Sequence, residues 1–140
     1  MRIKKFIPIF AAIFMLIFII GYIFIPTRLV NFATSDVTEI HIRDGNGGNE
    51  IDIDDASEIE YIVSGLDNLY SKTGDIQFGV GSSLYIDFIL DDGTTRSLLL
   101  QGPDSVVKRR IYYKPAGSDI SEVYYHVNEL VKVYGKQDEI

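Results

Sequence analysis

The chain contains no cysteine and no tryptophan, and it has only two histidines. Without cysteine there is no disulfide, no thiolate ligand for zinc or an iron–sulfur cluster, and no cysteine nucleophile. An excess of basic residues is also missing, because 13 Lys and Arg stand against 20 Asp and Glu, a formal charge of −7 at pH 7. Nucleic-acid binding gains from a positive field that releases counterions. We therefore expect no nucleic-acid partner and no cofactor.

Charged residues are absent from positions 6–26, which read FIPIFAAIFMLIFIIGYIFIP, while Arg2, Lys4 and Lys5 precede this run. About 20 helical residues span about 30 Å, the thickness of the hydrocarbon core of a bilayer. The run predicts a transmembrane anchor at 6–26, and the basic end at 1–5 predicts a cytoplasmic N-terminus. Secretion after signal cleavage is the alternative, although the apolar region of a signal peptide is normally about 7–15 residues.

The part of the chain after the apolar run is acidic. It holds all 20 acidic residues against ten Lys and Arg, a formal charge of −10. Its regular apolar spacing favours a packed fold over disorder. We predict a linker at 27–36, one extracytoplasmic domain at 37–135 and a polar tail at 136–140. An acidic body of this kind should be held away from an anionic membrane surface.

The first half of this domain predicts a β-hairpin followed by a helix. Alternating apolar residues indicate strands at 37–44 and 51–53, and the Gly- and Asn-rich segment 45–49 indicates the turn between them. The helix begins at the capping pattern Asp55-Ala56-Ser57-Glu58. Its apolar stripe recurs at helical spacing from Ile59 to Tyr70.

The second half predicts a three-stranded meander and a second helix. The strands are expected at 84–90, 96–101 and 106–114, with a tight turn at 91–94, after a loop at 71–83. Ser118 or Asp119 would cap the helix, whose stripe runs from Ile120 to Tyr134. The order ββα-βββα predicts an α+β two-layer sandwich, in which an antiparallel sheet of about five strands carries two helices on one face.

A basic and aromatic segment stands out in this acidic domain. Its members are the candidate contact residues for a partner: Lys108, Arg109, Arg110, Tyr112, Tyr113 and Lys114. On a strand, Lys108, Arg110, Tyr112 and Lys114 would share one face. Arg and Tyr are favoured at interfaces, so the segment indicates contact with an envelope protein, an anionic envelope polymer or a peptide strand. The alternative is an edge strand protected by its charges.

Other chemistry is weakly indicated. Asp44, Asn46 and Asp55 fall at positions 1, 3 and 12 of a calcium-loop pattern, but the glycine of position 6 is replaced by Asn49. Weak divalent binding between Asp44 and Asp55 is left open beside a solvated turn and helix cap. His41 and His126 have no spacing typical of a metal site. With no catalytic arrangement in view, we predict that the protein is not an enzyme.

The layout of a basic-apolar anchor, no cysteine and an acidic α+β ectodomain resembles that of small uncharacterised membrane-anchored extracytoplasmic proteins of Gram-positive bacteria. This resemblance covers layout alone, and it implies an envelope location and no catalysis. We therefore predict a single-pass membrane-anchored module that works by binding at the cell envelope. The alternative is an accessory subunit held in a membrane complex by its helix. The oligomeric state is left open.

Overall fold

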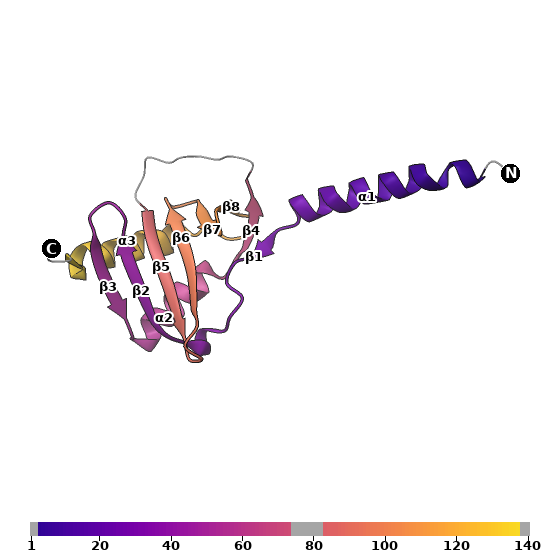
Figure 1. Ribbon diagram of the computed structural model, residues 1–140. Helices are drawn as coiled ribbons and strands as arrows, with labels where there is room; N and C mark the ends of the chain where they lie inside the picture. The colour runs from indigo at the N-terminus through magenta and orange to yellow at the C-terminus, as the bar shows by residue number, and fades with distance from the viewer. Residues whose placement is uncertain (1–2, 74–82, 138–140) are drawn as a thin grey trace.

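The computed structural model describes residues 3–73 and 83–137. The fold is α+β, as predicted, with an open antiparallel sheet and an N-terminal apolar helix (Figure 1). The helices are α1 (Ile7–Phe24), α2 (Ala56–Leu66) and α3 (Ser121–Tyr134). The strands are β1 (Thr27–Arg28), β2 (Val37–Asp44), β3 (Asn49–Ile53), β4 (Leu69–Lys72), β5 (Ser83–Leu90), β6 (Thr95–Gln101), β7 (Val106–Lys108), β8 (Ile111–Pro115) and β9 (Lys136–Gln137). Single turns of 3₁₀ helix lie at Ile3–Lys5 and Thr34–Asp36.

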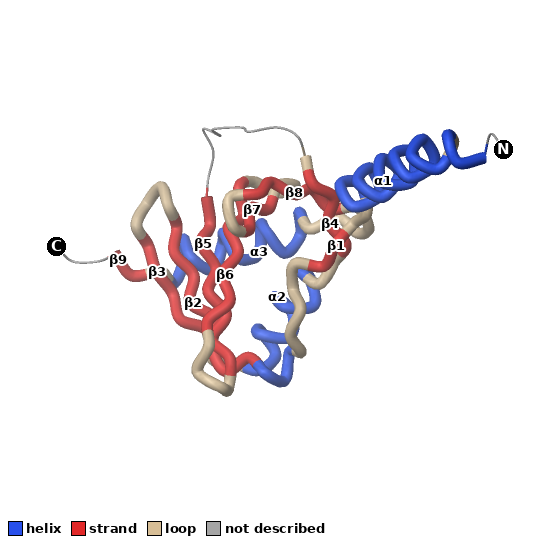
Figure 2. The backbone as a smooth tube through the Cα atoms, turned by 45° about the vertical axis from the view of Figure 1, so that its right-hand side comes forward, coloured by secondary structure: helices blue, strands red, loops and turns tan. Residues whose placement is uncertain are grey.

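The strands lie in the order β1-β4-β8-β7-β6-β5-β2-β3-β9, and neighbouring strands run antiparallel. β3 and β4 lie near opposite edges of this sheet, so α2, which joins them, must cross it. α3 joins β8 to β9 and crosses in the opposite direction. The two helices contact each other and β2 (Figure 2).

The core lies between this helix pair and one face of the sheet. β2 and β5 present alternate residues to it, since side chains of a strand point to opposite faces in turn. A register shift between Val37 and Glu39 accounts for the irregular apolar spacing at the start of β2. Among the described residues, the largest fully buried side chains are Tyr70, Phe88, Ile40, Ile42, Ile62, Leu66, Leu84, Ile86, Leu100, Ile120, Val106 and Val127.

The expectation of about five strands was wrong, since the structure describes nine. One extra strand comes from Leu69 and Tyr70, which we assigned to the end of the first helix but which belong to β4. A second comes from the interval 106–114, which is two strands joined by a tight turn rather than one. β1 and β9 add two residues each.

Residues 27–36, which we treated as a linker, pack against the domain. Thr27 and Arg28 pair with β4 as β1. Leu29 and Val30 are buried, with 3% and 4% of their surface exposed. In the expected polar tail, Lys136 and Gln137 pair with β3, and residues 138–140 lie outside the described residues.

α1 stands apart from the core. None of its residues is buried, and the apolar helix Ile3–Phe24 is long enough either to span a membrane or to be a signal sequence. The 18 residues of α1 correspond to about 27 Å at 1.5 Å per residue. A core helix of a soluble domain would be mostly buried, so this exposure favours a lipid-facing or targeting role. Figure 1 shows α1 projecting beyond β1 and β4.

Candidate functional site

A pocket of about 440 Å³ lies where the chain passes from α1 into the domain. Segment 25–31 forms one wall, and residues of β4, β6, β7 and β8 form another. Its lining residues are Tyr22, Ile25, Pro26, Thr27, Arg28, Leu29, Asn31, Lys72, Arg96, Lys108, Arg109, Ile111 and Tyr113. Five of these are basic, and none of the described lining residues is acidic. The fold therefore concentrates half of the basic residues of this acidic domain in one place.

The strand register explains why three of these cations lie on the side of the sheet that carries the core. Lys108 follows buried Val106 by two residues, so both side chains lie on the face of β7 that meets the core. Lys72 stands in the same relation to buried Tyr70, and Arg96 precedes buried Leu98 by two residues. These cations occupy core-facing positions at strand ends that α2 and α3 do not cover.

A tight turn between β7 and β8 presents a fourth cation, Arg109. Lys108 pairs with Ile111, which leaves Arg109 and Arg110 as the two turn residues. Their φ angles are 52° and 66°. Two successive positive φ values define the type I′ hairpin turn, in which Asn-Gly is the preferred pair. Arginine is strained in this conformation, so the turn keeps two guanidinium groups at the expense of stability.

Contacts within the protein hold two of the pocket cations, Lys108 and Lys72. The Lys108 ammonium donates a hydrogen bond to the Leu29 carbonyl at 2.7 Å, which ties segment 25–31 to β7. The Lys72 ammonium lies 4.9 Å from the centroid of the Tyr22 ring, a cation–π contact that joins β4 to α1. The anchor helix and the pocket are thus parts of one arrangement.

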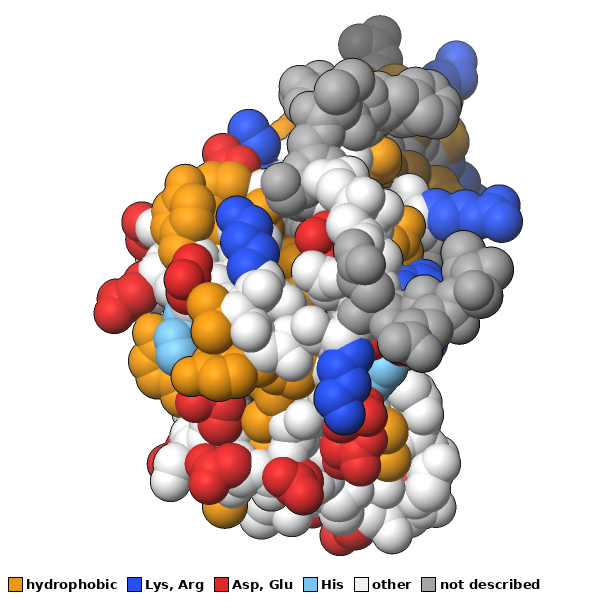
Figure 3. Space-filling model, turned by 90° about the vertical axis from the view of Figure 1, so that its left-hand side faces the viewer, with side chains coloured by type: hydrophobic (Ala, Val, Ile, Leu, Met, Phe, Trp, Pro, Cys, Tyr) orange, Lys and Arg blue, Asp and Glu red, His pale blue; other side chains and the backbone are white. Residues whose placement is uncertain are grey.

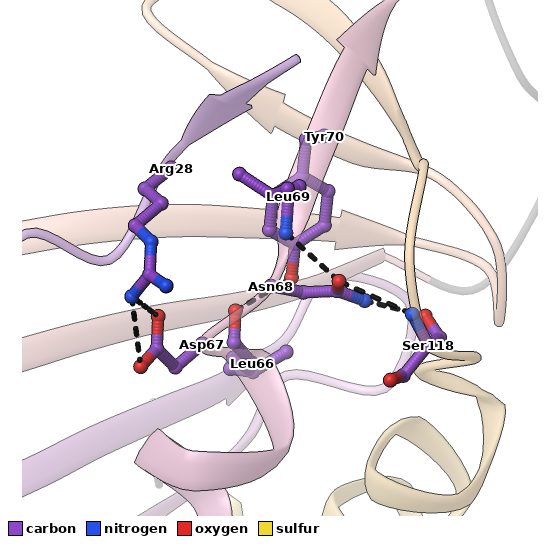
Figure 4. Close-up of polar contacts among 7 residues, drawn as sticks. All are labelled: Arg28, Leu66, Asp67, Asn68, Leu69, Tyr70 and Ser118. Carbon is purple, nitrogen blue, oxygen red and sulfur yellow. Dashed lines mark hydrogen bonds and ion pairs between the residues drawn. The ribbon is translucent and has the colours of Figure 1, made fainter.

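β4 itself is held by the polar contacts drawn in Figure 4. The Tyr70 hydroxyl donates to the Leu66 carbonyl at 2.7 Å, across the end of α2. The Asn68 amide donates to the Ser118 carbonyl, and its oxygen accepts from the backbone N–H of Leu69 at 2.8 Å. These bonds join the start of β4 to α2 and to the segment before α3, and they thereby position Lys72.

Arg28 lies at the same end of the domain and pairs with Asp67 at 3.2 Å (Figure 4). Both side chains are well exposed, so this pair contributes little to stability. Among the described residues, Arg28 is the one pocket cation that pairs with a carboxylate.

The cations of the pocket repel one another. Burial lowers the pKa of Lys108, and the positive charges of Arg109 and Arg96 lower it further. An anion placed among these side chains would reduce that repulsion and favour the charged ammonium. The chemistry supported by this arrangement is the binding of a negatively charged group.

The structure separates the six candidate contact residues. Lys108, Arg109 and Tyr113 line the pocket. Arg110 is exposed in the turn, and Tyr112, whose carbonyl accepts from the Thr73 N–H, is half-buried. The exposed Lys114 lines a separate hollow with Asp104 and Asp119. Since β7 and β8 are two strands, the single face expected for Lys108, Arg110, Tyr112 and Lys114 does not form.

The sequence reasoning missed Arg28, Lys72 and Arg96. They come from three strands far apart in the chain, and strand pairing alone brings them to one pocket. One local signal was available, because Lys72 and Arg96 each lie two residues from an apolar residue that proved to be buried.

The two histidines lie on opposite sides of the sheet. His41 alternates with buried Ile40 and Ile42, so it faces outward, where its Nδ1 lies 2.5 Å from Asp52. The hydrogen bond to Asp52 raises the pKa of His41, burial opposes it, and the negative charges of Asp52, Glu50 and Asp87 reinforce the rise. His126 on α3 bonds to Glu58 on α2.

Acidic side chains take structural roles in the described regions. Asp44 accepts from the Asn46 N–H in the β2–β3 turn, and Asp55 caps α2 by accepting from the Glu58 N–H, each at 2.9 Å. The two lie at opposite ends of β3, unlike the ligands of a calcium loop. In residues 3–73 and 83–137, no group of three or more His, Asp or Glu side chains is placed to hold a metal ion.

Charge is unevenly distributed over the domain. Figure 3 shows the end opposite α1, where acidic side chains are spread over the surface. A second hollow of about 520 Å³ between α2 and α3 is also acidic, with Glu60, Asp119 and Glu122 in its lining. The cationic pocket next to the anchor therefore contrasts in sign with these other surfaces.

Comparison with known proteins adds no functional assignment. The chain matches no protein-family model, no curated protein and no solved structure.

Proposed function

We propose that the chain is a single-pass membrane protein whose extracytoplasmic domain binds an anionic ligand at the cell envelope without catalysing a reaction. The observation that carries the proposal is the pocket of five basic residues beside the end of an exposed apolar helix. Arg2, Lys4 and Lys5 before the helix favour a cytoplasmic N-terminus, which leaves the pocket outside.

Topology can be tested cleanly because the chain has no cysteine. Single cysteines are introduced as Ile3→Cys, before α1, and Asn46→Cys, in the β2–β3 turn. A membrane-impermeant maleimide should label the Asn46→Cys protein in intact cells and the Ile3→Cys protein only after lysis. The reverse pattern, or recovery of the domain as a soluble secreted product, contradicts the proposal.

Anion binding is tested with the full chain in neutral detergent on a phosphate-bearing matrix. We compare the salt concentration that elutes the wild type with that for Arg96→Gln/Arg109→Gln. The matched control is Lys132→Gln/Lys136→Gln, which removes two exposed charges from α3 and β9. The pocket variant should elute at lower salt than the control, because clustered cations bind cooperatively whereas dispersed ones do not. Equal elution of the two variants contradicts a binding role for the pocket.

The accessory-subunit alternative places the interaction in the helix. Replacing 6–21 with an unrelated apolar segment of equal length, while the pocket residues Tyr22 and Ile25 are kept, separates the two functions. A tether tolerates the exchange, and anion binding by the domain is retained. A subunit that depends on helix packing loses its complex.

A further inference from the structure

We propose that the pocket binds the phosphate headgroup of an anionic phospholipid in the leaflet from which the domain emerges. This inference rests on the proposed function and names the ligand of the same pocket. Phosphate is the charged group, and it could arrive in a lipid or in a soluble compound. The observations favour the lipid source.

The first observation is the position of the pocket relative to the membrane. Tyr22 in the last turn of α1 and Ile25 just after α1 both line it. A helix of about 27 Å that spans a hydrocarbon core of about 30 Å places these residues at the boundary with the headgroups. Tyr is favoured at that depth because its ring is apolar and its hydroxyl polar. The pocket consequently opens at the layer that contains lipid phosphates.

The second observation is the mixed lining. Basic side chains occupy the strand side, whereas Tyr22, Ile25, Pro26 and Leu29 form an apolar wall continuous with the anchor. A phospholipid presents the same combination, with a phosphate next to an apolar glycerol ester region. A soluble polyanion would gain nothing from the apolar wall. The volume of about 440 Å³ lies within the range of small-ligand sites.

The third observation is the availability of the cations. The Lys108 ammonium uses one of its three donors on the Leu29 carbonyl. In the described part of the chain, Lys72, Arg96, Lys108 and Arg109 make no ion pair with a carboxylate. Their mutual repulsion is relieved when a phosphate enters, and guanidinium groups bind phosphate oxygens in a bidentate manner.

Binding of a lipid phosphate in this pocket also explains how an acidic domain can lie against an anionic leaflet. The part of the chain after α1, with a formal charge of −10, is repelled by an anionic leaflet as a whole. Repulsion falls off within about 8 Å at physiological salt, so the end of the domain beside the anchor dominates the interaction. A cationic pocket at that end holds the domain on the leaflet, while its acidic distal surface points into the aqueous phase.

The test uses the full chain in neutral detergent, with lipid binding measured by native mass spectrometry. The lipids are phosphatidylglycerol, which is anionic, and phosphatidylcholine, which is zwitterionic with the same acyl chains. The proteins are the wild type, Arg96→Gln/Arg109→Gln and the control Lys132→Gln/Lys136→Gln, each checked for folding by circular dichroism. Arg2, Lys4 and Lys5 are common to all three proteins, so their contribution cancels.

The wild type and control should prefer phosphatidylglycerol. The pocket variant should bind it about 30-fold more weakly, equivalent to about 2 kcal/mol for two basic residues near an anionic surface. Equal binding of both lipids by the wild type, or equal binding of phosphatidylglycerol by the pocket and control variants, overturns the inference.

A second experiment with soluble phosphates distinguishes lipid phosphate from soluble phosphate. It also distinguishes failure of the lipid inference from failure of the proposed anion-binding function. Glycerol phosphate and inorganic polyphosphate are titrated against the same proteins. If polyphosphate binds through Arg96 and Arg109 but the lipid preference is absent, the lipid inference fails and the proposed anion-binding function survives. If neither soluble nor lipid phosphate depends on these arginines, both fail.

Discussion

The turn between β7 and β8 offers a quantitative test, because it places two arginines where glycine and asparagine are normally found. Arg109 and Arg110 have φ angles of 52° and 66°. A residue with a β-carbon is destabilised there by roughly 1–2 kcal/mol. Replacement by Asn-Gly removes this strain at position 110, where glycine has no β-carbon, and lowers it at position 109, where asparagine tolerates a positive φ through its short polar side chain. Glycine offsets about 0.5–1 kcal/mol of this gain, because it increases the conformational entropy of the unfolded chain.

The double variant Arg109→Asn/Arg110→Gly should therefore be more stable than the wild type by about 1–2 kcal/mol. For a domain of roughly 110 residues this corresponds to a rise in Tm of about 4–8 °C. At the same time it removes two positive charges beside the pocket, so binding of phosphatidylglycerol should weaken. Opposite effects on stability and binding are expected where strain serves a function.

The assay is thermal unfolding of the full chain in neutral detergent, followed by circular dichroism. The matched control is Arg109→Gln/Arg110→Gln, which removes the same charges but retains β-carbons at both positive φ positions. This control should lose binding with little change in Tm. If the Asn-Gly variant is no more stable than the Gln-Gln control, the two arginines are not strained and the reasoning about the turn is refuted.

Three further outcomes are expected. Gly65→Ala should lower the free energy of unfolding by about 1–2 kcal/mol in urea titrations, because the new β-carbon would lie 2.9, 3.0 and 3.3 Å from the three side-chain carbons of Val123 and overpacking outweighs the gain in helix propensity. Val123→Ala in the same chain removes the two methyl groups and leaves only Cβ, so it should reduce that loss. Simple additivity of the two changes would contradict the contact. The raised pKa of His41 stabilises the fold fully below about pH 6.5, and this contribution is lost as pH rises through the folded-state pKa. Asp52→Asn should lower the pKa of His41 measured by NMR titration. An unchanged pKa would exclude the hydrogen bond to Asp52 as the cause of the shift. Tyr70→Phe should destabilise the domain by about 1–2 kcal/mol, since it removes a buried hydroxyl that donates to the Leu66 carbonyl in the last turn of α2. Full retention of stability would show that this hydrogen bond contributes nothing.

Much of the fold could be predicted because its signals are local. The apolar run of α1, the Asp55 cap of α2 and the Asp91–Thr94 turn depend on residues close together in the chain. Each of these elements is present in the structure. Alternation in β2 and β5 likewise records burial on one face of the sheet, which explains why the α+β class could be recognised.

The rest depends on contacts between distant residues. Leu69 and Tyr70 continue the helical spacing of α2, yet pairing with β1 and β8 draws them into a strand. The Arg109–Arg110 turn was missed because its residues are not those that favour positive φ. The pocket could not be predicted, since strands separated by tens of residues bring its cations together.

The placement of the pocket at the membrane surface is the central claim, and the depth of a spin label tests it most directly. Ile111→Cys at the pocket and Asn46→Cys in the β2–β3 turn are labelled in full-length protein reconstituted into phosphatidylglycerol vesicles. Collision with oxygen and with a water-soluble nickel chelate then reports depth by electron paramagnetic resonance. We predict that the label at position 111 lies in the headgroup layer while the label at position 46 lies in bulk water. Equal access of the chelate to both labels would contradict this account.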